Sequence, residues 1–365
     1  METTAAVHDH GLDDSRPAAP STWPLDAWYV AATPGEIADK PFARQICGIH
    51  VVFFRTEGRG ISALEDFCPH RGAPLSLGSV RGETLVCGYH GLAVDCRGRV
   101  DNMPSQRVKN FPSVRAFPVI ERYGFVWIWP GNPAGASPEA MHPLPWAESD
   151  EWAYGGGLYH IKCDYRLMID NLMDLTHETY VHSGSIGQKE IDETPVKTRV
   201  EGQEVVTSRM MDKVAAPPFW RMALRGAGLP EDAIVDRWQI CCFSLPSHVM
   251  IEVGVALEGE GGYHADNAKK ASSIVVDFIT PETETTHWYF WGMARQFAVA
   301  DAALTATIRE GQGKIFAEDL NMLEQQQRNL LLYPDRRLLK LNIDAGGARS
   351  RLMIDRAIAQ DRRTQ

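Results

Sequence analysis

Short apolar runs separated by turn residues dominate the first third of the chain. Between residues 23 and 133 these runs are rich in β-branched and aromatic residues, and glycine or proline stands between them. This pattern is typical of the strands of an all-β domain. It predicts strands within WYVAAT, ICGIHVVFF, TLVCGYHGLAV and FVWIWPG.

The pattern changes after residues 130–145, PGNPAGASPEAMHPLP, whose proline, glycine and alanine indicate a domain boundary. Residues 163–182 contain neither glycine nor proline and predict one helix, and residues 304–339 predict another. Between them, four runs predict one antiparallel sheet: RWQICCFSL, VMIEVGVAL, SSIVVDFIT and HWYFWGMARQF. We therefore expect an α+β domain, an antiparallel sheet with helices, at residues 134–365.

Length and composition agree with two folded domains. The chain has 365 residues, of which 44% are hydrophobic and 23% charged. The net charge of -10 lacks the basic footprint of nucleic-acid binding. No stretch approaches the roughly 18 to 20 apolar residues of a membrane span, and residues 1–22 do not resemble a secretory signal. We expect a cytoplasmic protein with a flexible leader at residues 1–22 and no nucleic-acid or membrane partner.

Four candidate metal ligands lie in CPHRGAPLSLGSVRGETLVCGYHG, residues 68–91. Cys68 and His70 stand on one loop, and Cys87 and His90 on another. One thiolate and one imidazole per loop suit a [2Fe-2S] cluster in which one iron takes both cysteines and the other both histidines. Structural zinc is the main alternative, but zinc fingers usually supply the cysteine pair first and the histidine pair afterwards. The mixed order favours the iron-sulfur cluster.

The spacing Cys-x-His-x16-Cys-x2-His resembles that of the Rieske family. Rieske proteins of respiratory complexes carry an additional cysteine on each loop, where this chain has Ala73 and Tyr89. The chain is therefore similar to the oxygenase and ferredoxin branch, and residues 23–133 are interpreted as a Rieske [2Fe-2S] domain. Five further cysteines are expected to be buried apolar residues: Cys47, Cys96, Cys163, Cys241 and Cys242.

A second group of candidate residues lies within NLMDLTHETYVH, where one helix would place four side chains inside roughly 140° of arc: Asn171, Asp174, His177 and His182. Two histidines and a carboxylate form the facial triad of non-heme Fe(II) sites. A His-x4-His pair alone is more often a surface or core pair. Rieske oxygenases, however, carry Asp-x2-His-x4-His about 90 residues after the cluster motif, as this chain does.

That resemblance implies a role for each of the four residues. His177 and His182 match the iron ligands, and Asp174 matches the acid that links the two metal centres. The Asp174 carboxylate would hydrogen-bond a cluster histidine on one side and His177 on the other. Asn171 matches a polar position beside the ligands. Residues 134–365 would then form the catalytic mononuclear iron domain.

The third iron ligand is expected in IFAEDLNMLEQQQ, which contains Glu318 and Asp319. Glu318 lies about 100° away from Asp319 around the helix and fits a solvated carboxylate at a helix N-terminus. The resemblance also favours Asp319. Helical spacing places Asp319 on an apolar face with four residues: Met322, Leu323, Gln326 and Leu330.

From about Leu25 onward, nearly the whole chain resembles the oxygenase components of the vanillate O-demethylase family. The resemblance implies a homotrimer that uses O2 to demethylate vanillate, giving protocatechuate and formaldehyde. It implies one [2Fe-2S] Rieske cluster and one mononuclear Fe(II) per chain, with electrons passing from His90 of one subunit to Asp174 of the next. The matching segments include DFCPHRGAPLSLG, ERYGF, EWAYGGGLYHI, IGQKEIDE, APPFWR, VDRWQIC and GQGKIFAEDL.

The chain has no G-x-G-x-x-G between a strand and a helix, so a dinucleotide site is not expected. The resemblance implies a flavin and ferredoxin-type iron-sulfur reductase that delivers electrons from NADH. Two alternatives remain: demethylation or hydroxylation of another substituted benzoate, and a Rieske electron-transfer module without oxygenase activity. The large second domain with His177, His182 and Asp319 argues against the module.

A methoxybenzoate substrate requires apolar walls and a few polar groups. Trp238, Trp288 and Trp291 are candidates for the walls. Each candidate also fits an ordinary role in the core or in a surface ion pair. The candidates for binding the carboxylate are Arg225, Arg237 and His248.

Overall fold

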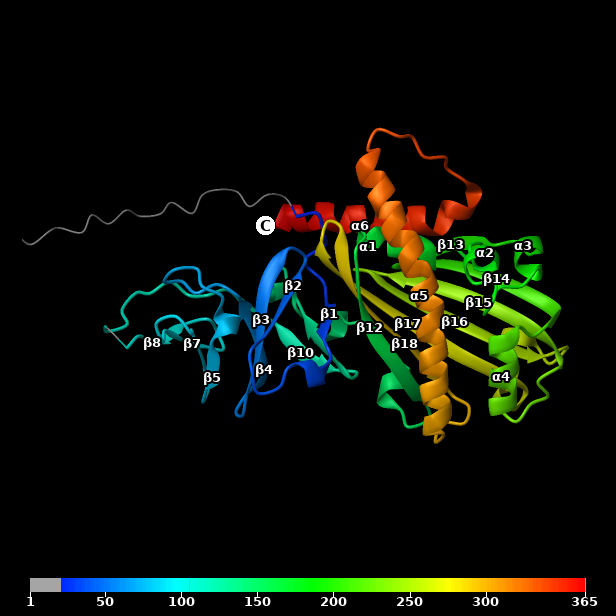
Figure 1. Cartoon of the computed structure of the whole chain (residues 1–365), viewed down its shortest axis with the longest axis horizontal. Coiled ribbons are helices and arrows are strands. Elements are labelled where there is room, and N and C mark those ends of the chain that lie inside the picture. Colours follow the sequence, from blue (N-terminus) through cyan, green and yellow to red (C-terminus); the bar gives the residue numbers. More distant parts are fainter. Residues whose placement is uncertain (1–20, 105, 365) are drawn as a thin grey trace, which may run out of the picture.

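The computed structural model describes residues 21–104 and 106–364. Residues 1–20, most of the expected leader, lie outside the described residues. Three small antiparallel sheets, built from residues 29–128, form the first structural half of the molecule (Figure 1). Their strands, in spatial order, are β1 (Tyr29–Ala32), β11 (Phe125–Ile128) and β10 (Val119–Arg122); β2 (Phe42–Ile46), β3 (Ile49–Thr56), β4 (Gly60–Glu65) and β9 (Ala116–Phe117); and β5 (Ser79–Arg81), β6 (Thr84–Val86), β7 (Ala93–Asp95) and β8 (Val100–Asn102).

One seven-stranded antiparallel sheet dominates the second half. The four predicted strand runs form its neighbouring strands β15 to β18, so the prediction of a single antiparallel sheet is confirmed. The strands in spatial order are β12 (Ala153–Ile161), β18 (Thr286–Arg295), β17 (Lys270–Thr283), β16 (His248–Leu257), β15 (Ile234–Ser244), β14 (Glu204–Ala215) and β13 (Lys197–Glu201).

Helices cover one face and one end of this sheet, with the long α5 lying across the face (Figure 1). The first part therefore consists of antiparallel strands, and the second part of a sheet with helices, which confirms the predicted fold class. The helices are α1 (Tyr165–Leu172), α2 (Glu178–Val181), α3 (Glu190–Glu193), α4 (Pro218–Gly226), α5 (Ala302–Leu332) and α6 (Ala345–Thr364). The helix predicted at 304–339 ends at Leu332, shortly before Pro334, because a proline cannot continue the hydrogen-bond ladder.

The two faces of β17 and β18 bury different neighbours. Phe278 and Phe290 point to the first half of the chain, where they pack with Trp127. Ile279 and Tyr289, the chain neighbours of Phe278 and Phe290, belong to the core beneath α5. This alternation follows from the period of two in a strand and explains why both strands are apolar on both faces. The sheet therefore forms a wall between the first half and the α5 side.

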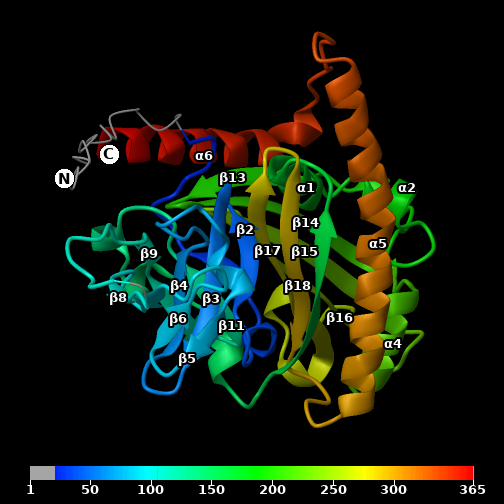
Figure 2. The same cartoon turned by 60° about the vertical axis from the view of Figure 1, so that its left-hand side comes forward.

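Hydrogen bonds across this wall hold the two halves together. The Thr280 hydroxyl donates to the Val30 carbonyl at 2.6 Å, and the amide of Cys47 donates to the carbonyl of Pro281 at 2.7 Å. The last helix, α6, extends back toward the first half (Figure 2). There the Asp361 carboxylate accepts a bond from the backbone amide of Leu25 at 2.6 Å.

The expected burial of the five remaining cysteines is confirmed for three of them. Cys47, Cys163 and Cys241 are buried, whereas Cys96 and Cys242 are only half-buried. The difference has a simple origin, because Cys96 follows the end of a short strand and Cys242 faces away from the core beneath α5. All seven cysteines are free thiols.

Candidate metal centres and substrate cavity

Two loops of the first half share one backbone pattern. The carbonyl of Cys68 accepts a hydrogen bond from the amide of Gly72, and the carbonyl of Cys87 accepts one from the amide of Gly91. Both glycines have positive φ angles, 68° and 75°, in a region where a side chain would be strained. The two cysteines therefore occupy equivalent places in two similar loops.

The four predicted cluster ligands lie together between these loops. The thiols of Cys68 and Cys87 are buried and contact each other. The rings of His70 and His90 are exposed, and their centroids lie 4.6 Å apart. Two thiols on the buried side and two imidazoles on the exposed side suit a cluster with thiolates on one iron and imidazoles on the other. The donor set therefore fits a Rieske cluster.

The helix predicted over 163–182 is wrong in one respect, because it is broken after α1. Side-chain bonds to the backbone compete with helix formation here. The Asp174 carboxylate accepts from the backbone amide of Thr176 at 2.7 Å, and the backbone carbonyl of Asp174 pairs with Nδ1 of His177 at 2.7 Å. The short α2 then runs from Glu178 to Val181, with His177 and His182 at its two caps. The four polar side chains are therefore arranged by a broken helix.

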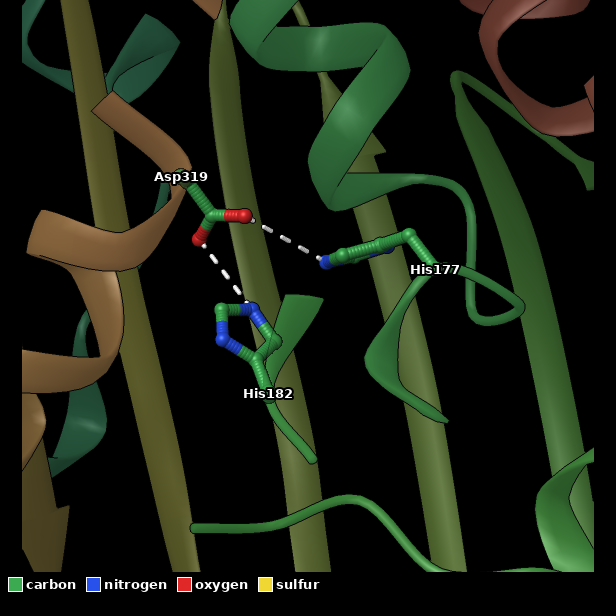
Figure 3. A group of neighbouring side chains, drawn as sticks. All are labelled: His177, His182 and Asp319. Carbon is green, nitrogen blue, oxygen red and sulfur yellow. Dashed lines mark ion pairs between the residues drawn. The ribbon is translucent and has the colours of Figure 1, made fainter. Parts of the chain in front are cut away.

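His177, His182 and Asp319 point toward one another (Figure 3). Nε2 of His177 lies 3.6 Å from Oδ1 of Asp319, and Nε2 of His182 lies 3.3 Å from Oδ2. Asp319 is only 3% exposed. Burial disfavours the charged form of His182, but bonds to Asp319 and then Glu318 outweigh it and raise the pKa of this imidazole. A divalent cation bound here would pair with the Asp319 carboxylate in place of the proton on His182.

The spacing of these three side chains fits a single metal ion. Ligand atoms about 2.1 Å from one ion and at right angles lie about 3 Å apart, close to the observed separations. Two imidazoles and one carboxylate on one side of an ion are the donor set of non-heme iron, which leaves positions for other ligands. His177, His182 and Asp319 can therefore hold the mononuclear iron.

Neighbouring groups orient all three side chains. Nδ1 of His182 lies 2.7 Å from Oε2 of Glu318, and the Asn171 amide donates to Oδ1 of Asp319 at 3.1 Å. Glu318 is exposed to solvent as expected, but its expected place at a helix N-terminus is wrong, since it lies in the middle of α5 and contacts His182. Asp174 was expected to bond His177 through its carboxylate, but the bond uses its backbone carbonyl.

The buried face of α5 differs in part from the predicted one. Asp319 and Leu323 are buried as predicted, but Met322 is exposed and so is Gln326. Gln327 is buried instead and accepts a bond from the backbone amide of Asp164. Gln327, a polar residue with a backbone partner, thus takes the buried place that was expected for the apolar Met322.

A cavity opens beside Asp319 and the two histidines, and these three residues form part of its lining. Most of its walls are apolar and come from α1, α4, α5 and the sheet: Leu172, Phe219, Trp220, Ile251, Val253 and Phe316.

Sequence reasoning missed several polar residues of the cavity wall. Glu178 is buried directly after His177, and Gln239 donates to its Oε1 at 2.5 Å. Gln312 precedes Asp319 by two helical turns, so helical spacing was a signal that could have found it. Nothing in the local sequence indicates Glu178 and Gln239, which meet across about 60 residues.

Only one of the residues suggested for the substrate pocket lines this cavity, and it is Arg237. Arg225 is largely exposed and pairs with Glu231 at 3.4 Å. His248 is fully buried, and burial lowers its pKa to about 3. None of the three suggested tryptophans is a wall residue, because they pack elsewhere in the core: Trp238, Trp288 and Trp291.

None of the helices in the described part of the chain combines the length and apolarity that crossing a membrane requires.

Comparison with known proteins agrees with these two centres. A family profile described as Rieske [2Fe-2S] domain matches residues 27–115, and one described as vanillate O-demethylase oxygenase C-terminal domain matches residues 161–360. The crystal structure of dicamba monooxygenase with non-heme iron and dicamba superposes with a TM-score of 0.80 at 29% identity, covering 94% of this chain and 100% of that one. A [2Fe-2S] cluster and a mononuclear iron are thus the cofactors, as predicted.

Two curated relatives match almost the full length. The vanillate O-demethylase oxygenase subunit of Pseudomonas sp. strain HR199 is 67% identical over 340 residues, which cover 93% of this chain and 96% of that protein. A putative toluene-4-sulfonate monooxygenase iron-sulfur subunit of Comamonas testosteroni is 34% identical, covering 91% and 96%. The chain therefore belongs to the vanillate O-demethylase oxygenase family of Rieske-type oxygenases.

Proposed function

We propose that this chain is the terminal oxygenase that O-demethylates vanillate. Vanillate, O2, two electrons and two protons give protocatechuate, formaldehyde and water. The observation that carries the proposal is the buried triad of His177, His182 and Asp319 at the wall of an apolar cavity. The 67% identity to a vanillate O-demethylase oxygenase subunit supports vanillate as the substrate. Family membership rules out the alternative of an electron-transfer module without a catalytic site.

The protein contributes to this mechanism by positioning the reacting groups and by excluding water. When bound, the iron supplies the oxidising power for attack on the methyl group, and the cluster supplies single electrons. Asp319, His177 and His182 would hold the iron, and the Asn171 amide fixes one Asp319 oxygen. Phe316 and other apolar side chains keep water away from a methoxy group placed there.

The cluster would be held by Cys68, Cys87, His70 and His90, and its electrons would reach the iron of a neighbouring subunit. The two Rieske loops, next to β5 and β7, and the iron site, next to α2, lie at opposite ends of the molecule (Figure 1). Electron transfer over so long a span within one chain would be slow. Asp174, which is half-buried and lies three residues before His177, is the proposed contact for His90 of the neighbour.

Exposed apolar side chains support a homotrimer. Large apolar residues normally avoid contiguous exposure unless a partner covers them. One group surrounds the two exposed cluster histidines: Phe67, Leu77 and Tyr89. A second group lies where α5 ends and in the segment after it: Leu331, Leu332, Tyr333, Leu338, Leu339 and Leu341. A ring in which the first group of one chain faces the catalytic half of the next would cover both.

The remaining features of the proposal concern the partners and the setting. As an oxygenase component, the chain requires a separate reductase, which we propose is a flavin and ferredoxin-type iron-sulfur protein that oxidises NADH. None of the seven cysteines forms a disulfide, which is in keeping with the cytoplasm. The proposed division of the chain is a leader at 1–22, a Rieske domain at 23–133 and a catalytic domain at 134–365.

Steady-state turnover with a ferredoxin-type reductase and NADH tests the proposal. Vanillate-dependent O2 uptake should yield formaldehyde and protocatechuate in equal amounts, and Asp319→Ala should abolish both products. If vanillate gives no formaldehyde but another substituted benzoate gives product, vanillate is not the substrate. The chain would still be an oxygenase.

A further inference from the structure

The guanidinium group of Arg237 is a buried cation in the wall of the substrate cavity. Arg237 is 3% exposed, and among the residues that line the cavity it is the only arginine or lysine. It lies on β15, two residues before Gln239, whose amide reaches Glu178 beside the iron ligands. One side of the cavity therefore carries a fixed positive charge a short way along the sheet from the proposed iron site.

The hydrogen bonds of Arg237 leave one edge of the guanidinium group only partly used. Nη1 donates to the carbonyl of Ile186 at 3.1 Å and to Oε1 of Gln188 at 2.6 Å. Nη2 reaches Oε2 of Glu178 only at 3.4 Å, and Nε is buried without a partner. The edge formed by Nε and Nη2 is the one that arginine uses to bind a carboxylate with two parallel bonds.

The buried charges around this edge do not balance. A second guanidinium, that of Arg209, is buried behind Gln239, and its Nε and Nη2 also lack partners. Glu178 is the one buried carboxylate that attracts both cations. The other carboxylates that act on them are only half-buried or exposed: Asp174 and Asp192 for Arg209, and Glu190 for Arg237. Burial lowers the pKa of both guanidinium groups, which shows that their charged forms are costly in this place. A buried charge without a partner favours a ligand of the opposite sign.

We propose that Arg237 binds the carboxylate of the aromatic substrate through its Nε and Nη2 edge. This inference rests on the proposed demethylase function and adds the residue that selects acids over neutral aromatic ethers. An anion bound there compensates the excess positive charge. The ring then lies between the apolar walls, and the methoxy group points away from Arg237, toward His177, His182 and Asp319.

Arg237 also contacts residues 186–188, so a purely structural role has to be distinguished from carboxylate binding. A structural role would be to hold this segment over the cavity through Nη1. Loss of that role would weaken the binding of every ligand of the cavity alike, whereas loss of a carboxylate partner would weaken the binding of anionic ligands only. The comparison of a charged ligand with a neutral ligand of the same shape separates the two roles.

The experiment measures anaerobic binding of vanillate and of vanillyl alcohol to the holoenzyme by calorimetry. Vanillyl alcohol keeps the ring, the methoxy group and the phenol but has no charge. Arg237→Gln should weaken vanillate binding at least tenfold, the usual scale of a charged hydrogen-bonded contact, and change vanillyl alcohol binding less than about twofold. Arg237→Lys, which keeps the charge but not the two-donor edge, should fall between wild type and Arg237→Gln for vanillate.

Gln188→Ala is the matched control, because it removes one contact to residues 186–188 and no charge. It should affect the two ligands equally. Equal losses for both ligands in Arg237→Gln and Arg237→Lys, or no loss at all, would overturn the inference. If the inference about Arg237 fails but the wild type still releases formaldehyde from vanillate, the proposed function stands. A wild type that neither binds nor converts vanillate would overturn the function, and the inference with it.

Discussion

Oε2 of Glu318 lies 2.7 Å from Nδ1 of His182, and Glu318 directly precedes Asp319 in the chain. One turn of α5 therefore contributes both a proposed iron ligand and the carboxylate that orients another. With Nδ1 bonded to Glu318, Nε2 of His182 faces Asp319. A carboxylate behind a ligating histidine fixes the tautomer and raises the basicity of the nitrogen that binds the metal.

Glu318→Ala should weaken the binding of Fe(II) to the mononuclear site by roughly 10-fold to 100-fold. The reason is that His182 loses the partner that orients its ring. Equilibrium dialysis against Fe(II), with the cluster intact, measures this affinity directly. Glu310→Ala is the control, because Glu310 lies on the same helix in an exposed pair with Lys314. Equal iron affinity in the Glu318 variant and the control would show that Glu318 has no such role.

Asp174→Asn should retain both metal centres and lose nearly all turnover. The asparagine side chain can still accept from the amide of Thr176, so the break between α1 and α2 should persist. What is lost is the negative charge proposed to contact His90 of the neighbouring subunit. Stopped-flow reoxidation of the reduced cluster, with vanillate and O2 present, measures the step. A cluster that reoxidises at the wild-type rate would contradict the bridging role.

Asp277→Asn should stabilise the protein increasingly as pH rises. Asp277 is fully buried in β17 and accepts a bond from the Tyr289 hydroxyl at 2.6 Å, and burial raises its pKa to about 8. The folded state therefore holds a proton that the unfolded chain releases above about pH 4. Because of Asp277, the free energy of unfolding of the wild type falls by about 1.4 kcal/mol per pH unit between about pH 4 and pH 8, and then levels off.

The asparagine variant lacks this titration, so its advantage over the wild type should grow with pH and reach a plateau above about pH 8. Denaturant unfolding of both proteins at several pH values measures the difference. A difference that stays constant from about pH 5 to pH 8 would show that Asp277 is ionised throughout.

Leu77→Asp should dissociate the proposed trimer. Leu77 is 78% exposed next to the cluster loops, and its carbonyl lies against Gly88, beside the exposed Tyr89. A charge at the centre of an apolar contact loses hydration without gaining a partner. Sedimentation velocity should give a trimer for the wild type and smaller species for the variant. A wild-type monomer, or a variant that stays trimeric, would contradict this part of the proposal.

Fixed spacing and helical phase made much of the fold and the candidate site predictable. Runs rich in β-branched residues were enough for strands such as β16 and β17. The order of Cys68, His70, Cys87 and His90 indicated the cluster because few metal sites use it. Helical phase placed Asp319 on the buried side of α5.

The features that sequence reasoning missed depend on contacts between distant segments or on side-chain competition with the backbone. The break after α1 arises because Asp174 and Thr176 bond locally, which hydrophobic periodicity does not record. Met322 was expected to be buried, but it is 58% exposed, and Gln327 is buried instead. The cavity joins Trp220 of α4 to Phe316 of α5, residues that lie almost 100 positions apart.

The central claim is that this chain uses a Rieske cluster and an iron held by His177, His182 and Asp319 to demethylate vanillate. Iron and acid-labile sulfide counts, followed by one turnover of the chemically reduced protein with vanillate and O2, test it most directly. We expect about three irons and two sulfides per chain and formaldehyde in proportion to the mononuclear iron. Only two irons per chain after reconstitution with Fe(II), and no formaldehyde, would contradict it.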